Sequence, residues 1–174
     1  MSRCYAIADL HLGHKNILKF RPSFKSVEFH DKYIVNRILE TCGKRDSLYL
    51  LGDCFFSVES LDHLREMKSK IGSIHMVLGN HDTENKLRLS IIMTALNEGL
   101  IDSIHGLLKY KGIWLSHAPI HETELRGKYC VHGHTHSVVV DDNRYLGVSC
   151  EQVAYKPINF QAIKEIFEEW KELS

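Results

Sequence analysis

The chain has 174 residues, enough for one domain with a substantial hydrophobic core. Lysine plus arginine and aspartate plus glutamate number 22 each, so a broad electrostatic attraction to nucleic acid or to an anionic membrane is not indicated. The five cysteines are scattered, which favours reduced thiols over a disulfide framework or a structural zinc site. No apolar run approaches membrane-spanning length and no leader precedes the first strand, so we expect a cytoplasmic protein with no membrane association and no obligate protein partner.

The first predicted strand covers residues 3–8 and ends at Asp9-Leu10-His11. Because side chains alternate along an extended segment, Asp9 and His11 are predicted to point to the same side and to hold one cation. A carboxylate beside an imidazole suits Mn, Fe or Zn better than Ca.

The segment that follows is predicted to be a loop. Its basic residues, among them Arg21, either reach a substrate phosphate or lie on a solvated surface, and the sequence does not distinguish the two. The role of His14 is equally open.

Strands and amphipathic helices then alternate. The spacing of apolar residues predicts helices over 28–42, 59–70 and 85–98, with strands over 47–51 and 74–78 between them. The first of these strands runs into Gly52-Asp53 and the second into Gly79-Asn80-His81-Asp82. Open α/β sheets bind ligands at the carboxyl ends of their strands, so these polar residues are candidates for function.

Hairpins are predicted to dominate the second half of the chain. The first pairs residues 104–110 with 113–115 and brings His117 to the rim. A strand at 129–131 then runs into His132-Gly133-His134-Thr135-His136, and a second hairpin pairs 138–140 with 145–148.

Two features complete the chain. His121 is either close to the site or, as we favour, a surface histidine. A last helix begins after Asn159 as its cap. Together the elements predict a single α/β domain over residues 1–174: a two-sheet β-sandwich flanked by helices, with early strands partly parallel and later ones antiparallel.

Seven candidate ligands stand at the predicted strand ends: Asp9, His11, Asp53, Asn80, His117, His134 and His136. One zinc-like ion needs three or four protein ligands, so seven suit two ions that share a bridging carboxylate. Asp53 is the natural bridge because it stands alone after its strand. Two such ions are suited to hydrolysis of a phosphoester.

The order of these motifs resembles the calcineurin-like metallophosphoesterases, which carry Asp-x-His, Gly-Asp, Gly-Asn-His-Asp/Glu, a lone His and Gly-His-x-His. Here they are Asp9-Leu10-His11, Gly52-Asp53, Gly79-Asn80-His81-Asp82, His117 and Gly133-His134-Thr135-His136. The resemblance covers nearly the whole chain. The surrounding phrases are similar to short single-domain members from bacteria and tailed phages.

The resemblance implies the family's α/β/β/α fold and a division of labour among the ligands. Asp9, His11 and His136 would hold one divalent ion and Asn80, His117 and His134 the other, with Asp53 between them. Mn²⁺ is the first expectation, and the mixed N and O donors also permit Fe, Zn, Ni or Co. His81 would stabilise the phosphate and protonate the leaving oxygen, oriented by Asp82.

We therefore expect a metal-dependent phosphoric ester hydrolase in which activated hydroxide attacks phosphorus in line. A short chain without an evident cap domain favours a phosphodiester, a nucleotide or a nucleic-acid end over a phosphoprotein. The alternatives are a phosphomonoesterase and a non-catalytic interaction scaffold of the same fold. A scaffold usually lacks ligands, and none is missing here. A metallo-β-lactamase fold is disfavoured because its His-rich motif lies near the start of the chain and continues into Asp-His.

Overall fold

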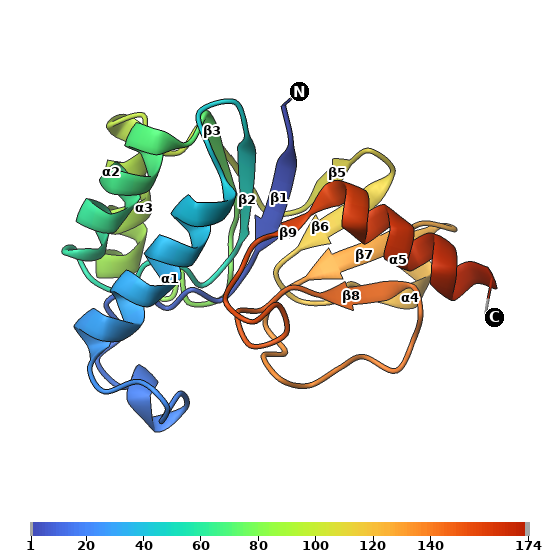
Figure 1. The fold of residues 1–174 in the computed structure, drawn as a ribbon, viewed down its shortest axis with the longest axis horizontal. Helices are drawn as coiled ribbons and strands as arrows, with labels where there is room; N and C mark the ends of the chain where they lie inside the picture. The colour runs from blue at the N-terminus through green and yellow to red at the C-terminus, as the bar shows by residue number, and fades with distance from the viewer. Residues whose placement is uncertain (1, 173–174) are drawn as a thin grey trace.

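A computed structural model describes residues 2–172, which form two β-sheets with helices packed on them (Figure 1). The first sheet has the strand order β4-β3-β2-β1-β9. Its strands are β1 (Cys4–Ile7), β2 (Ser47–Leu51), β3 (Ser73–Val77), β4 (Ser103–His105) and β9 (Ile158–Asn159). Strands β1 to β4 are parallel and β9 pairs antiparallel with β1. Parallel pairing brings the carboxyl ends of β1, β2 and β3 to one edge.

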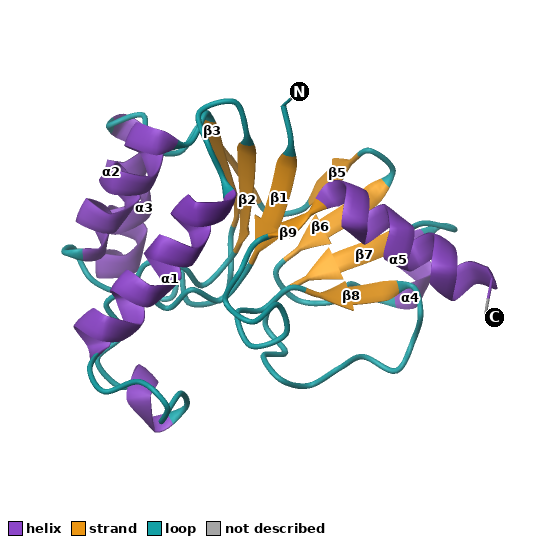
Figure 2. Ribbon diagram, viewed as in Figure 1, coloured by secondary structure: helices purple, strands orange, loops and turns teal. Residues whose placement is uncertain are grey.

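The second sheet has the order β5-β6-β7-β8 and lies against the first (Figure 2). Its strands are β5 (Leu108–Tyr110), β6 (Ile113–Ser116), β7 (Tyr129–His132) and β8 (Tyr145–Gly147). Strands β6, β7 and β8 run parallel. In Figure 1 the arrowheads of β7 and β8 point toward the first sheet, so the carboxyl ends of both sheets meet where the sheets join.

Three amphipathic helices cover the outer face of the first sheet: α1 (Val27–Thr41), α2 (Ser60–Lys70) and α3 (Lys86–Asn97). Their apolar faces share one buried cluster with Ile7, Leu50 and Met76 of the sheet. The Ser26 side chain caps α1 and the Asn85 side chain caps α3, each by accepting a backbone N–H of the first turn. The predicted helices therefore form where expected, with ends shifted by at most one residue.

Three helical segments remain among the described residues. They are η1 (Ile17–Lys19), a short 3₁₀ turn in the loop after β1, then α4 (Glu122–Leu125) and α5 (Phe160–Glu172). Phe160, Ile163 and Phe167 of α5 join the core between the sheets. Asn159 caps α5 as predicted, since its Oδ1 accepts the N–H of Gln161 at 2.7 Å. The predicted two-sheet α/β fold flanked by helices is confirmed.

Two details of the predicted second half are wrong. Residues 103–105 extend the first sheet beside β3, and only the segment after Gly106 joins the hairpin β5–β6. Residues 138–140 form no strand, and Val138 and Val139 are 68% and 76% exposed. The chain uses residues 133–144 as a crossover into a parallel strand, which a two-residue hairpin turn does not allow. The later strands are therefore mostly parallel.

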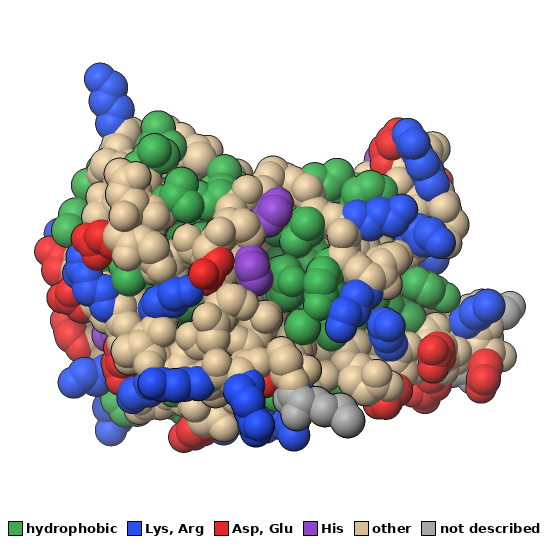
Figure 3. All heavy atoms as spheres, turned by 90° about the horizontal axis from the view of Figure 1, so that it is seen from above, with side chains coloured by type: hydrophobic (Ala, Val, Ile, Leu, Met, Phe, Trp, Pro, Cys, Tyr) green, Lys and Arg blue, Asp and Glu red, His purple; other side chains and the backbone are tan. Residues whose placement is uncertain are grey.

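The surface agrees with the neutral composition. On the face seen in Figure 3, lysine and arginine side chains are interspersed with aspartate and glutamate, and no continuous field of one sign forms. Within residues 2–172, no helix is both long enough and apolar enough to cross a membrane.

Candidate metal centre

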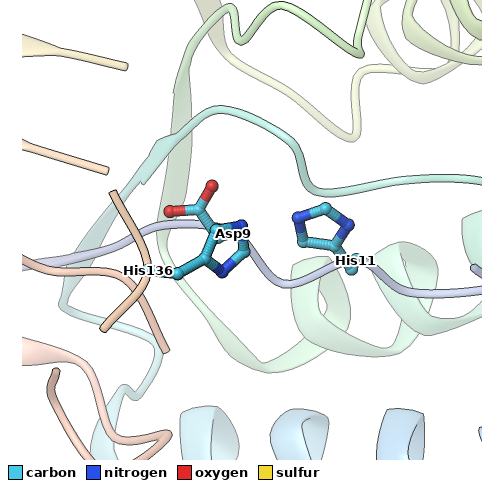
Figure 4. A group of neighbouring side chains, drawn as sticks. All are labelled: Asp9, His11 and His136. Carbon is cyan, nitrogen blue, oxygen red and sulfur yellow. The ribbon is translucent and has the colours of Figure 1, made fainter. Parts of the chain in front are cut away.

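The first group of candidate ligands gathers at the end of β1. Asp9, His11 and His136 each offer a donor atom, and these atoms lie within 4.8 Å of one another. Figure 4 shows the three side chains turned toward a common point, with Asp9 and His11 on one stretch of chain. Asp9 and His136 come from segments far apart in sequence, which meet because β1 and β7 end at the same edge.

The prediction that an extended backbone brings Asp9 and His11 to the same side is wrong. Asp9 and His11 have φ values of 58° and 52°, so both lie in the left-handed region and the segment is not extended. The conformation is held by two backbone hydrogen bonds to the neighbouring loop. The N–H of Asp9 donates to the carbonyl of Gly52 at 3.0 Å and the N–H of His11 to that of Asp53 at 3.0 Å.

The second group lies at the ends of β2, β6 and β7. Asp53, His117 and His134 offer donor atoms within 4.8 Å of one another. The His117 Nε2 atom is 3.2 Å from Asp53 Oδ2 and 2.9 Å from Asn80 Oδ1. Asn80 therefore belongs to this group, and the structure brings all seven predicted ligands to one edge.

Two glycines permit this close approach. A Cβ atom on Gly133 would lie 2.7 Å from Asp9 Oδ2 and 2.5 Å from Ala8 Cβ. A Cβ atom on Gly79 would lie 2.6 Å from the backbone nitrogen of Asp53. Only glycine lets the backbone of each loop pass so close to the neighbouring aspartate.

The donor chemistry fits divalent cations. His11 Nε2 is buried and has no hydrogen-bond partner among the described residues. Burial lowers the pKa of His11 far below its usual range, so its imidazole is neutral and its lone pair is available. Asp9 is fully buried, and burial raises its pKa. A buried carboxylate beside an unpartnered imidazole nitrogen is the arrangement that a bound cation would stabilise.

Asp53 and His117 form a buried ion pair. Burial opposes charge on His117, but the hydrogen bond and the negative charge of Asp53 raise the pKa of His117 to about 9. Burial likewise disfavours charge on Asp53, yet His117 lowers the pKa of that carboxyl overall. A cation at this point would take the place of the His117 proton.

His81 and Asp82 follow Asn80, but they do not form the predicted pair. The Asp82 carboxylate is buried and accepts the backbone N–H groups of Gly79 at 2.7 Å and Asp53 at 2.9 Å. It ties the two loops together and does not contact the His81 ring. The His81 Nδ1 atom is instead bonded to Glu84. Asp82 points inward because those buried N–H groups have no strand partner.

Comparisons with known proteins decide the family. A sequence model described as "Calcineurin-like phosphoesterase superfamily domain" matches residues 3–152. The chain belongs to the calcineurin-like phosphoesterase superfamily. It is 28% identical to an uncharacterized protein of Methanocaldococcus jannaschii, with 98% of this chain and 94% of that protein covered. It is 26% identical to the gene 66 protein of Mycobacterium phage L5, with 80% of each covered.

One solved structure is also similar to this phosphoesterase domain. A protein of unknown function from Aquifex aeolicus superimposes with a TM-score of 0.72 at 26% identity, covering 95% of this chain and all of that one. The family and the fold are therefore shown for this chain, and its two His/Asp groups are consistent with a dinuclear centre.

Sequence reasoning missed Glu151 in this phosphoesterase domain. Its Oε1 accepts from His136 Nδ1 at 3.1 Å and from Arg21 Nε at 2.8 Å. Burial disfavours its charge, but these two partners lower the pKa of Glu151 to about 2. A carboxylate on the second nitrogen of a ligand histidine fixes its ring orientation. Glu151 follows the mostly apolar segment 145–150, so the rule that identified the candidate ligands could also have identified Glu151 as a site residue.

Arg21 answers one question left open by the sequence. It is 2% exposed and its guanidinium is bonded to protein groups, so it does not lie on a solvated surface and the structure does not support a contact with a substrate phosphate. Besides its bond to Glu151, its guanidinium donates to the backbone carbonyls of Asp9 at 2.7 Å and Leu10 at 3.2 Å. Arg21 thereby braces the left-handed segment and the residue that orients His136.

His14 and His121, whose roles the sequence left open, lie in different places. His14 lies beside the first group, with its Nδ1 atom 3.3 Å from His11 Nδ1 and its ring stacked on Phe56. His121 is exposed and caps α4 by accepting the N–H of Thr123. The favoured surface position of His121 is confirmed.

Proposed function

We propose that this protein is a dinuclear-metal phosphoesterase that acts on a phosphodiester or nucleotide. The observation that carries the proposal is the pair of donor groups at one edge, Asp9, His11 and His136 in one and Asp53, His117 and His134 in the other. We assign Asn80 to the second ion and Asp53 to both. Asp53 suits a bridge because its carboxylate contacts His117 while its backbone carbonyl accepts the N–H of His11.

The chemistry that bound divalent ions supply is Lewis-acid activation of water and of phosphoryl oxygen. The protein's own contributions are positioning and proton transfer. The His81 backbone N–H donates to Asp53 Oδ1 at 2.9 Å, which fixes the residue beside the proposed bridge. We assign to the His81 imidazole the proton that the leaving oxygen needs, with Glu84 orienting the ring.

The solvent exposure of the centre supports a phosphodiester substrate, which carries an organic group on each side of the phosphorus. Asn80 and His134 are exposed, and the His81 side chain is 43% exposed. The centre therefore opens to solvent at the edge of the sheets, where a diester can enter. Mn²⁺ is the first candidate ion because the donors mix imidazole nitrogen with carboxylate and amide oxygen.

The test compares bis(p-nitrophenyl) phosphate with p-nitrophenyl phosphate on metal-stripped protein after addition of Mn²⁺, Zn²⁺, Ni²⁺ or Mg²⁺. We expect metal-dependent turnover that favours the diester. Preference for the monoester would replace the proposal with a phosphatase. Absence of turnover in protein shown to bind two ions would replace it with the scaffold.

Asp53→Asn tests the bridge in the same experiment. The amide keeps the shape of the side chain but removes the charge that two cations would share, so we expect fewer than two ions per chain by elemental analysis and a rate at least about 100-fold lower. Asp141→Asn, on an exposed loop, is the matched control. Two ions retained in Asp53→Asn would contradict the assignment.

A further inference from the structure

A groove of about 1050 Å³ lies beside the metal centre. Its walls come from the loop after β1, the start of α1, the loop before α2 and the start of α3. His14 and Phe56 line its inner end and both contact His11, the Phe56 ring lying 4.5 Å from that of His11. Among the described residues that line it, none is a proposed metal ligand or His81. A substrate bound at the centre would therefore reach this groove only through a group beyond its reacting phosphorus.

Arg88 lines this groove with its hydrogen-bonding capacity largely unused. Its guanidinium lies over the Phe56 ring, 3.7 Å from the centroid, and among the described residues it donates only to the Phe55 carbonyl, at 3.5 Å. Within residues 2–172, no carboxylate lies at ion-pair distance from it, and Glu84, the acidic neighbour, is bonded to His81. Arginine carries five N–H donors, so most of these remain available. Burial lowers the pKa of Arg88, which shows that the charge is partly desolvated.

The position of Arg88 is unfavourable for the helix that carries it. It lies in the first turn of α3, where the helix dipole favours negative charge, and that turn has no acidic residue. Its support is nevertheless rigid. The Phe56 N–H donates to the Leu12 carbonyl at 2.7 Å, which ties the aromatic platform to the loop of the first metal group. A cation held firmly in such a place is suited to bind an anion.

The charges of the groove indicate how large that anion is. Apart from Arg88, its lysines and carboxylates are Lys15, Lys32, Glu28, Asp31 and Glu59. These opposite charges leave no continuous basic track of the kind that binds long nucleic acid. Recognition is therefore concentrated at one guanidinium beside the centre.

We propose that Arg88, held on Phe56, binds a second phosphate of the substrate, so that the preferred substrates are small nucleotide esters with a phosphate beyond the one that reacts. This inference rests on the proposed phosphoesterase function and names its substrate class. A guanidinium binds a phosphate through paired N–H groups, which one lysine does not reproduce.

The experiment uses two chromogenic esters that differ by one group. They are thymidine 5′-(p-nitrophenyl phosphate) and the same ester with a 3′-phosphate. We expect the wild-type protein to have a kcat/KM about tenfold or more higher for the ester with the 3′-phosphate. Arg88→Ala should remove that preference while keeping turnover of the simpler ester, and Arg88→Lys should restore part of it. Arg126→Ala, at a side chain 77% exposed at the end of α4, is the control and should keep the preference.

A binding measurement separates this inference from the proposed function. Calorimetry should show that thymidine 3′,5′-bisphosphate binds wild-type protein more tightly than thymidine 5′-phosphate, and that Arg88→Ala binds both equally. Turnover without any preference in wild type, or a preference that survives in Arg88→Ala, overturns the role of Arg88 and leaves the phosphoesterase intact. Absence of turnover of every ester counts against the proposed function, while the calorimetry still tests Arg88.

Discussion

His81 and Asp82 are adjacent in sequence but lie in opposite environments. The Asp82 side chain is buried among backbone N–H groups, whereas the His81 ring faces solvent beside Glu84. The sequence places both residues at the site because they follow a strand. It does not show which way each side chain turns, since that depends on the unpaired N–H groups of a loop formed 28 residues earlier.

His81→Ala tests the proposed proton donor. The imidazole is not among the proposed ligands, so the variant should keep its metal content by elemental analysis. Loss of a general acid typically costs about 10²- to 10⁴-fold, and it costs least when the leaving group needs no proton. We therefore expect a small rate loss for p-nitrophenyl esters and a large one for alkyl esters. Glu84→Gln should show part of the same pattern, and an equal loss across leaving groups would exclude the acid role.

At the scale of elements, the strand ends were the most predictable part of the molecule. An apolar segment followed directly by Asp, Asn or His identified five loops that meet at one edge. The partners of those loops were harder to foresee. The crossover 133–144 contains an apolar run that resembles a strand, but it leaves the sheet so that β8 can pair parallel to β7. Arg21 and Glu151 are joined across 130 positions, a separation at which one sequence contains no pairing signal.

Gly133→Ala tests how closely two of these elements must pack. The added methyl group would overlap Ala8 and the Asp9 carboxylate, so the loop carrying His134 and His136 must shift away from β1. We expect weaker metal binding, by about 10- to 100-fold, with secondary structure retained by circular dichroism. Gly106→Ala is the matched control because its methyl group would meet no atom within 4 Å. Unchanged metal affinity in Gly133→Ala would show that the loop position is not critical.

For the whole molecule, stability depends on whether a proton on His117 or a metal ion supplies the positive charge at the edge where the sheets meet. The hydrogen bond and negative charge of Asp53 raise the pKa of His117 from 6.5 to about 9. A raised pKa means that the protonated form stabilises the fold: the contribution is complete below pH 6.5 and is lost as pH rises through about 9. Its full size is about 3.5 kcal/mol, since a difference of one in pKa corresponds to about 1.4 kcal/mol. His136, whose pKa Glu151 raises, acts in the same direction.

Metal-free protein should therefore lose about 2 kcal/mol of this stabilisation between pH 7 and pH 9, which corresponds to about 4 to 8 °C in Tm for a chain of this size. The stabilisation by saturating Mn²⁺, added under nitrogen, should instead increase with pH, because ligand histidines must be deprotonated to bind the ion. The rise in Tm caused by Mn²⁺ should thus grow over the same interval, as measured by scanning calorimetry. His117→Asn should flatten both curves, because it removes the titrating group and one ligand of the second ion. A Mn²⁺ effect that does not change with pH would show that metal and proton do not compete for this edge.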